Sequence, residues 1–151
     1  MIKIICVGKI KEKYLKEAIT EYEKRLSKYT KLEIIECIDY DNPNKDIVLE
    51  QEYTQIIKHI KEKDFVITME IEGDMLSSIE FSSKLNKIFN YNSNIVFVIG
   101  GSLGLSDKIK QRSNYKLSMS KMTLPHQLFR VILLEQIYRA FKINNNETYH
   151  K

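Results

Sequence analysis

The chain has few of the residues that build disulfide frameworks, metal sites or membrane segments. Its 151 residues include two cysteines, two prolines, five glycines and no tryptophan. Cys6 and Cys37 lack Cys-x-x-Cys spacing and fall in strand-like stretches, so we expect buried free thiols in a reducing compartment, with no disulfide and no metal site. No apolar run approaches the roughly 20 residues that span a bilayer, and the N-terminus lacks a signal-peptide pattern. These absences predict a cytoplasmic protein without a membrane or metal partner.

The charges that are present are unevenly distributed. Residues 1–100 carry 15 Lys+Arg against 17 Asp+Glu, whereas residues 101–151 carry 9 against 3. The last third therefore has a net charge of +6, although the whole chain has only +4. Such a segment favours a partner with a phosphate backbone, and a solvated basic face explains it equally well.

Patterns typical of strands and helices alternate along the chain, whose length suits one domain with a full core. The alternation predicts an α/β fold: a single domain over residues 1–151, with a parallel-type sheet and flanking helices. Ser77, Ser106 and Thr123 precede the last three expected helices and are expected to cap them. The expected strands span 2–7, 32–39, 65–71, 95–99 and 115–119, and the expected helices 14–29, 47–61, 77–90, 106–112 and 125–142.

The most informative segment is Ile95–Gly104, which reads Ile-Val-Phe-Val-Ile-Gly-Gly-Ser-Leu-Gly. Five apolar residues are typical of a central strand covered on both faces, and ligands of open α/β sheets bind just beyond the carboxyl ends of such strands. Three glycines within five residues let a ligand approach the backbone closely. Because Gly100-x-x-x-Gly104 matches neither the dinucleotide fingerprint nor the P-loop, we expect a ligand other than NAD or a nucleoside triphosphate.

The last expected helix is apolar on more than one side. A helix that covers a sheet needs only one apolar stripe, so the surplus indicates a second buried face. This face is either sandwiched within the subunit or buried in a homodimer. We favour the homodimer, because so short a chain offers few elements to cover a second face.

Several motifs occur in a specific order. They are Gly100-Gly101-Ser102-Leu103-Gly104-Leu105, Leu117-Ser118-Met119-Ser120-Lys121-Met122-Thr123, Pro125-His126-Gln127-Leu128, Arg130-Val131, Glu135-Gln136-Ile137-Tyr138-Arg139-Ala140 and the terminal Tyr149-His150-Lys151. Together with Val7-Gly8-Lys9 and Glu21-Tyr22-x-Lys24-Arg25 nearer the start, they make the whole chain resemble the bacterial RlmH family, the SPOUT-class rRNA pseudouridine methyltransferases.

The resemblance implies a fold and a reaction. The fold is expected to be a homodimer with a C-terminal trefoil knot, a topology that no periodicity argument predicts. The expected methyl donor is S-adenosylmethionine. The expected acceptor is N3 of a pseudouridine in 23S rRNA, modified on the assembled 70S ribosome at the subunit interface.

The resemblance also implies a cofactor site. Met69, late in the third strand, stands where the family usually has leucine, a nearly volume-conserving exchange. A further departure is Asn145-Asn146-Glu147, where a glycine is usual. Taken alone, Met119 and Met122 suit a hydrophobic core better than a cofactor site, and both interpretations can hold because the walls of a cofactor site are usually core residues at their inner edge. The implied cofactor residues are Met69, Gly100, Met119, Ser120, Lys121, Met122, Thr123 and Leu124.

The family's Tyr-His-Lys tail lies at the active site, although by sequence alone a penultimate histidine suits a frayed terminus. We expect His150 to position the acceptor base or remove its proton, and Tyr149 to stack on or pack against that base. Proton removal by a water or by the nucleoside itself is the alternative. Arg139 and Lys151 are expected to contact a phosphate or the acceptor. His126 is a second candidate base in the substrate site, and its place in a helix's first turn suits capping or packing equally well.

The candidate rRNA contacts are Arg112, Lys116, Lys121, Arg130 and Lys142. Arg130 and Arg139 lie nine residues apart on the last helix and hence on roughly opposite faces, so we expect different roles, one of them structural. Glu135 would destabilise this apolar helix if it were buried without a partner, so we expect a partner within the subunit or across the dimer, with Arg130 and Arg139 as the candidates.

Three functions fit the sequence to different degrees. The leading one is an S-adenosylmethionine-dependent rRNA methyltransferase. The alternative is a non-catalytic ribosome- or RNA-binding module with the same fold, which needs only the basic third. A flavodoxin-like small-ligand protein fits less well, because the loop Gly8-Lys9-Ile10-Lys11 lacks a Ser/Thr-rich phosphate cradle.

Overall fold

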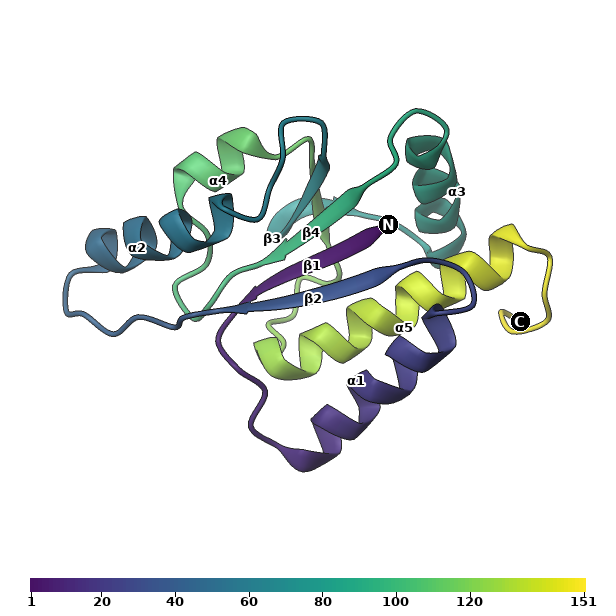
Figure 1. Ribbon diagram of the computed structural model, residues 1–151, viewed down its shortest axis with the longest axis horizontal. Helices are drawn as coiled ribbons and strands as arrows, with labels where there is room; N and C mark the ends of the chain where they lie inside the picture. Colours follow the sequence, from purple (N-terminus) through teal and green to yellow (C-terminus); the bar gives the residue numbers. More distant parts are fainter.

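One five-stranded parallel sheet organises the computed structural model, which describes residues 1–151 (Figure 1). The strand order is β2-β1-β4-β3-β5, and all neighbouring strands run parallel. This confirms the expected α/β class with flanking helices. The elements are β1 (Ile2–Val7), α1 (Lys13–Leu26), β2 (Leu32–Cys37), α2 (Lys45–Ile57), β3 (Phe65–Met75), α3 (Ser78–Phe89), β4 (Ile95–Ile99), α4 (Asp107–Arg112), β5 (Tyr115–Ser118) and α5 (His126–Asn144).

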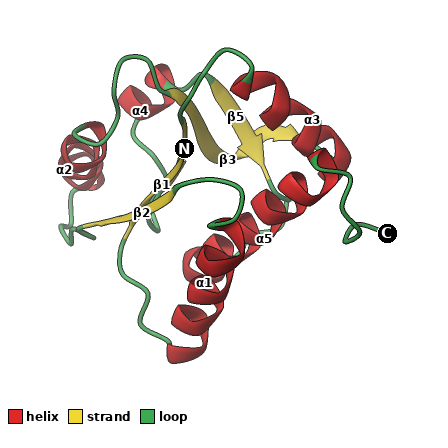
Figure 2. Ribbon diagram, turned by 45° about the vertical axis from the view of Figure 1, so that its right-hand side comes forward, coloured by secondary structure: helices red, strands yellow, loops and turns green.

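Helices cover both faces of the sheet. Figure 2 shows α1, α5 and α3 on one side of the strands and α2 and α4 on the other. Alternate residues of the central strands enter two separate cores: Ile4 and Phe97 belong to the first, and Ile5 and Val98 to the second. Every residue of β1 and β4 is buried, which explains why both strands are apolar instead of alternating, except for Lys3, whose Nζ donates to the carbonyl of His59. None of the five helices combines the length and the apolarity that a bilayer crossing requires.

The apolar surplus of α5 is largely covered within the chain. The helix packs against both α1 and α3, and Leu133, Leu134 and Ile137 are fully buried in the first core. The sequence argument that too few elements remain to cover a second face is therefore wrong. What stays partly uncovered is a narrower stripe, with Leu128 39% exposed and Val131 and Ile132 half-buried.

Two of the three expected helix caps are confirmed. Ser77 accepts a hydrogen bond from the backbone of Glu80, whose side chain accepts one in return, which forms a capping box. Ser106 caps α4 by accepting from the backbone N–H of Ile109. Thr123 caps nothing: the residue before α5 is Pro125, and no side chain caps this helix.

Strand β3 is longer than the pattern predicted, because a bulge interrupts the strand without ending it. Met69 and Asp74 both pair with Leu117 of β5, and the register shifts between them. Gly73 makes this close contact feasible, since a Cβ atom there would lie 2.7 Å from the backbone carbon of Lys116. Within the bulge, Glu70 and Ile71 have no partner residue in β5, and both line a cavity at the carboxyl ends of β4 and β5.

Both cysteines are buried and free, as expected. Burial raises the pKa of the Cys6 thiol to about 12. The thiol therefore stays protonated at neutral pH and behaves as a small apolar side chain.

Glu52 of α2 is a buried residue whose carboxyl group has no hydrogen-bonding or ionic partner. The residue is only 4% exposed, and burial together with the nearby Asp39 raises its pKa to about 7. The folded protein thus holds a proton that the unfolded chain releases near the ordinary value of 4.5. Stability is expected to fall as the pH rises through this interval, because the charged form is penalised only in the folded state.

Replacing Glu52 with glutamine is expected to remove this dependence. Between pH 5 and pH 8 the variant should gain about 1–3 kcal/mol in free energy of unfolding relative to wild type. Urea unfolding at the two pH values measures the gain. Glu62→Gln, at an exposed position, is the matched control and should track wild type, and parallel curves for Glu52→Gln and wild type would contradict the assignment.

Candidate functional site

A cavity of about 680 Å³ lies beside the bulge of β3, where the chain leaves β4 and β5 at their carboxyl ends. Its size falls in the range of small-molecule sites, and nine of its nineteen lining residues are hydrophobic, as is typical of such sites. The lining residues are Met69, Glu70, Ile71, Ile99, Gly100, Gly101, Ser102, Gly104, Leu105, Leu117, Ser118, Met119, Ser120, Met122, Thr123, Leu124, Pro125, His126 and Phe129.

The loop after β4 turns tightly on its glycines. Gly104 has a φ of +79° and its N–H donates to the carbonyl of Gly101, which closes the turn. A Cβ atom on Gly100 would lie 2.5 Å from the carbonyl oxygen of Gly104, so no larger residue fits there unless the turn moves. The glycines that the sequence singled out thus form one wall of the cavity from bare backbone.

The loop after β5 forms the opposite wall and is held by two serines. Ser118 donates from its hydroxyl to the carbonyl of Ser120, and Ser120 accepts from the backbone N–H of Met122. The backbone N–H groups of Lys121, Thr123 and Leu124 have no partner within the chain. These groups are available to a ligand that carries hydrogen-bond acceptors.

The structure brings together seven of the eight expected cofactor residues around this one cavity. Lys121 alone does not line it, and its exposed side chain lies at the tip of the loop. His126, expected in the substrate site, lines the same cavity from the first turn of α5. Sequence reasoning missed Glu70, Ser102 and Phe129, although the rule that ligands bind beyond parallel strand ends indicated the region.

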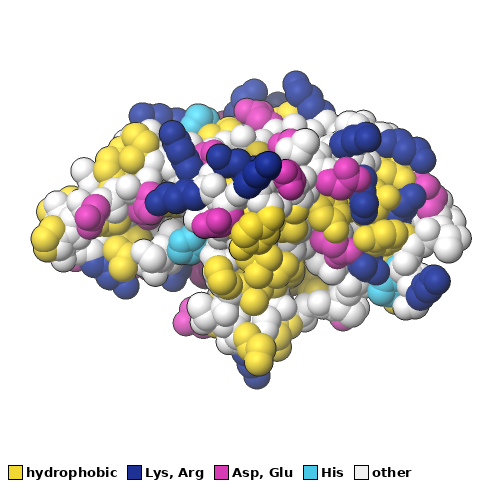
Figure 3. All heavy atoms as spheres, turned by 90° about the horizontal axis from the view of Figure 1, so that it is seen from below, with side chains coloured by type: hydrophobic (Ala, Val, Ile, Leu, Met, Phe, Trp, Pro, Cys, Tyr) yellow, Lys and Arg dark blue, Asp and Glu magenta, His cyan; other side chains and the backbone are white.

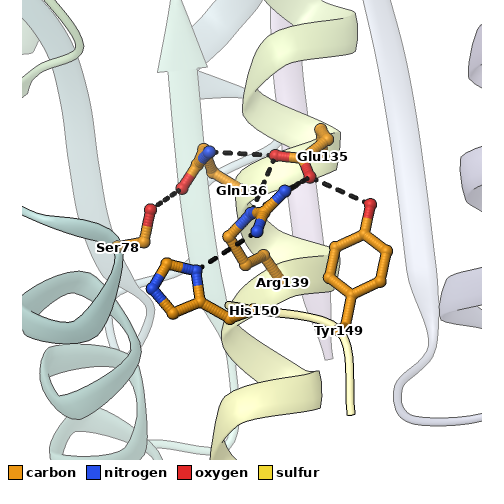
Figure 4. Close-up of polar contacts among 6 residues, drawn as sticks. All are labelled: Ser78, Glu135, Gln136, Arg139, Tyr149 and His150. Atoms are coloured by element: carbon orange, nitrogen blue, oxygen red, sulfur yellow. Dashed lines mark hydrogen bonds and ion pairs between the residues drawn. The ribbon is translucent and has the colours of Figure 1, made fainter.

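A second cluster lies farther along α5, where the C-terminal tail folds back onto the helix (Figure 4). Glu135 accepts hydrogen bonds from the guanidinium of Arg139, at 2.6 Å, and from the hydroxyl of Tyr149, at 3.0 Å. Gln136 donates to the same carboxylate and accepts from Ser78 of α3. The expected ion pair of Glu135 with an arginine is confirmed, and Arg139 is the partner.

His150 completes this cluster through a contact of 3.2 Å between its Nδ1 and Nη1 of Arg139. Because a guanidinium only donates, Nδ1 must be the accepting nitrogen, and the neutral ring then carries its proton on Nε2. The Tyr149 ring packs edge-on against Tyr138, at 5.1 Å, and the Arg139 guanidinium lies over it, at 4.7 Å. His150 therefore presents a hydrogen-bond donor to its surroundings.

The cavity and the tail cluster lie at different points along α5. Phe129 lines the cavity and Arg139 holds the tail, and ten residues of helix correspond to about 15 Å. Within one chain, the expected cofactor site and the expected catalytic residues are therefore not side by side.

Arg130 occupies the interior, not a surface where RNA binds. Its side chain is 2% exposed, and it donates to the Glu36 carboxylate at 2.8 Å and to the backbone carbonyls of Val7 and Gly8 at 3.1 and 2.7 Å. These bonds tie α5 to the ends of β1 and β2. Of the two arginines on α5, Arg130 has the structural role.

Most other basic residues of the last third also have partners within the chain. Arg112 donates to three backbone carbonyls at the turn before β3, and Lys142 pairs with Glu147. Lys108 and Lys110 pair with glutamates of neighbouring elements. Lys116, Lys121 and Lys151 form no ion pair, so they are the cations of this segment that remain available to a partner.

Comparison with known proteins identifies the family. The family model described as "Predicted SPOUT methyltransferase" matches residues 1–150. A Clostridium botulinum protein (strain Okra / Type B1) named "Ribosomal RNA large subunit methyltransferase H" is 57% identical over 157 aligned residues, covering 99% of both chains. The chain belongs to the RlmH family of SPOUT methyltransferases. A relative of the same name from C. botulinum strain Langeland is 56% identical over the same share of both chains.

The fold is shared more widely than the sequence. A solved structure, "The structure of a probable methylase family protein from Haemophilus influenzae Rd KW20", superposes with a TM-score of 0.58 at 14% identity. The match covers 99% of this chain and 70% of that one. The resemblance that the ordered motifs indicated is therefore confirmed at the level of family and fold.

In the structure, no group of three or more His, Cys, Asp or Glu side chains is arranged to hold a metal ion.

Proposed function

We propose that this protein transfers a methyl group from S-adenosylmethionine to N3 of a pseudouridine in 23S rRNA on the assembled 70S ribosome, in the cytoplasm. The observation that carries the proposal is the cavity at the β4 and β5 loops, in a chain 57% identical to a protein named as an rRNA large-subunit methyltransferase.

The residues around the cavity fit S-adenosylmethionine. Ile99, Leu117 and Leu124 supply apolar walls for a flat adenine ring, and the unpaired N–H groups after β5 supply donors for its nitrogens. The cofactor contributes an electrophilic methyl group on a sulfonium. The chain's part is to hold donor and acceptor in line, since positioning supplies much of the rate in such a displacement.

Replacing Gly100 with alanine is expected to weaken S-adenosylmethionine binding at least tenfold, measured by titration calorimetry. The added methyl group meets the backbone oxygen of Gly104 at 2.5 Å, so the cavity wall must shift. Leu103→Ala is the control: Leu103 lies at an exposed position of the same turn and does not line the cavity, so the affinity of this variant should match wild type. Equal affinities for Gly100→Ala and wild type would contradict this model of the cavity.

The separation of cavity and tail supports a homodimer in which each site takes residues from both subunits. Leu128, Val131 and Ile132 form the uncovered stripe of α5, between Phe129 and Arg139. Figure 3 shows hydrophobic side chains gathered in the centre of the face where α1 and α5 lie. A two-fold contact between opposed α5 helices, centred on this stripe, brings the tail of one subunit to the cavity of the other.

The trefoil knot belongs to the same proposal. After β5, at the edge of the sheet, the chain returns through the loop 119–125 to place α5 between α1 and α3. We place the knot at this return, with the loops after β4 and β5 as its crossing segments.

In the composite site, His150 positions the acceptor. With Nδ1 engaged by Arg139, its Nε2–H is free to donate to a carbonyl oxygen of the base, and the N3 proton leaves to water. Tyr149 packs against the base, while Lys151 and His126 contact the substrate from the two sides of the site. Lys116 and Lys121 extend the basic surface toward the rRNA backbone.

The deciding experiment supplies labelled S-adenosylmethionine to unmodified 70S ribosomes and to free 50S subunits and identifies the labelled nucleoside. Label in 3-methylpseudouridine, mainly from 70S, is the expected result. Cofactor binding without label would overturn the acceptor assignment. Absence of both would leave the alternative, a non-catalytic ribosome- or RNA-binding module.

A further inference from the structure

Glu147 joins the C-terminal tail to the far end of α1. Its Oε1 accepts a hydrogen bond from the Tyr29 hydroxyl at 2.8 Å, and its Oε2 accepts one from Nζ of Lys142 at 2.9 Å. Nζ of Lys28 lies 3.5 Å from the same oxygen. Three donors, one from α5 and two from the turn after α1, thus converge on one carboxylate, which none of the expected cofactor or catalytic residues contacts.

The backbone reverses immediately before this residue. Asn146 has a φ of +54° and donates to the carbonyl of Ile143, and Glu147 donates to that of Lys142. Asparagine is the residue other than glycine that adopts this left-handed conformation most readily at a helix end. Asn146 therefore supplies the turn, and the tail leaves α5 in a defined direction.

The partners of Glu147 are themselves held in place. The Tyr29 ring stacks on Phe141 at 5.7 Å, and the Lys142 side chain is only 16% exposed, with Nζ over the ring of Tyr138. Exposed ion pairs contribute little to stability, because the cost of ordering two mobile side chains offsets their attraction. Around Glu147, packing against aromatic rings already orders the side chains of Tyr29 and Lys142. Hydrogen bonds from Lys142 and Tyr29 lower the pKa of Glu147 to about 2, so the carboxylate stays charged at any pH at which the protein works.

We propose that Glu147 is a positioning residue for methyl transfer: it anchors the tail so that Tyr149 and His150, two and three residues later, reach Glu135 and Arg139. Three residues of chain span at most about 11 Å, so fixing Glu147 confines His150 to a small volume. Glu147 itself touches neither cofactor nor acceptor. The effect on catalysis rests on the proposed function. The effect on the order of the tail rests on the geometry alone.

The first test measures the order of the tail without any substrate. Carboxypeptidase is expected to release His150 and Tyr149 at least tenfold faster from Glu147→Ala than from wild type. Glu147→Gln, which loses the charge but keeps the shape, should fall between the two. Glu23→Gln, on the exposed surface of α1, removes the same charge without breaking a side-chain contact and should match wild type. Equal release from Glu147→Ala and wild type would overturn the proposal whatever the acceptor is.

The second test addresses catalysis. Glu147→Ala is expected to lower kcat for methyl transfer about tenfold while the Kd for S-adenosylmethionine changes less than twofold, because the cavity lies at the other end of α5. Tyr29→Phe should reproduce part of the loss, and the double variant Tyr29→Phe/Glu147→Ala should be no worse than Glu147→Ala. Additive losses, or a loss of cofactor affinity equal to that in kcat, would show a general structural defect and contradict a positioning role.

Discussion

Replacing Arg130 with alanine is expected to lower the free energy of unfolding by about 3–5 kcal/mol. The side chain is 2% exposed, and its guanidinium donates to the Glu36 carboxylate and to the carbonyls of Val7 and Gly8. Alanine leaves these acceptors without their donor and empties a large buried volume. Because these contacts tie the start of α5 to the ends of β1 and β2, the loss removes a direct link between segments that are distant in sequence.

Urea unfolding at neutral pH measures this loss. The control is Lys108→Ala, which breaks an ion pair of the same length between exposed side chains, Lys108 and Glu50, and should change the free energy of unfolding far less. Arg130→Met keeps most of the volume without the hydrogen bonds and should lie between the two. Equal free energies of unfolding for Arg130→Ala and Lys108→Ala would show that the buried contacts of Arg130 do not stabilise the fold. A role for Arg130 in contacting RNA would then have to be reconsidered.

Deleting Tyr149–Lys151 is expected to lower turnover at least about 100-fold while S-adenosylmethionine binds with unchanged affinity. The deletion removes the donor at His150 and the ring packed on Tyr138 but leaves Glu147 and the cavity intact. Single-turnover methyl transfer and titration calorimetry measure the two quantities. Unchanged turnover would contradict a catalytic role for the tail.

The same deletion tests whether each site is shared between subunits. Mixed dimers of the deleted chain with Gly100→Ala should regain part of the activity, because the deleted chain supplies an intact cavity and its partner an intact tail. If cavity and tail of one chain acted together, neither subunit of the mixture would hold a complete site. Absence of regained activity in verified mixed dimers would contradict the composite site.

The sequence predicts the architecture well because the signals that it depends on are local. Apolar runs such as Ile95–Ile99 mark buried parallel strands, and Ser77 with Glu80 marks a helix start through contacts only three residues apart. The cavity was located by the general position of ligands beyond strand ends. The structure confirms seven of the eight expected cofactor positions as its neighbours, while their binding role remains a proposal.

The failures involve contacts between distant segments or distortions of regular geometry. The partners of Arg130 are more than 90 residues away, so nothing near it in sequence indicates burial. The basic excess of the last third is paired mainly with acids and carbonyls of earlier segments, as Arg112 and Lys108 show. The bulge in β3 depends on the approach of Gly73 to β5, which hydrophobic alternation does not encode.

The place of α5 between α1 and α3 has a consequence for how the protein matures. This helix covers the face of the sheet that carries Ile4 and Phe97, yet it is made last, from residues 126–144. During translation residues 1–125 emerge before α5, so the part of this apolar face that α1 and α3 leave uncovered stays open to solvent or chaperones until α5 has followed. The native packing of this core therefore waits for α5, although all five strands of the sheet are made before it.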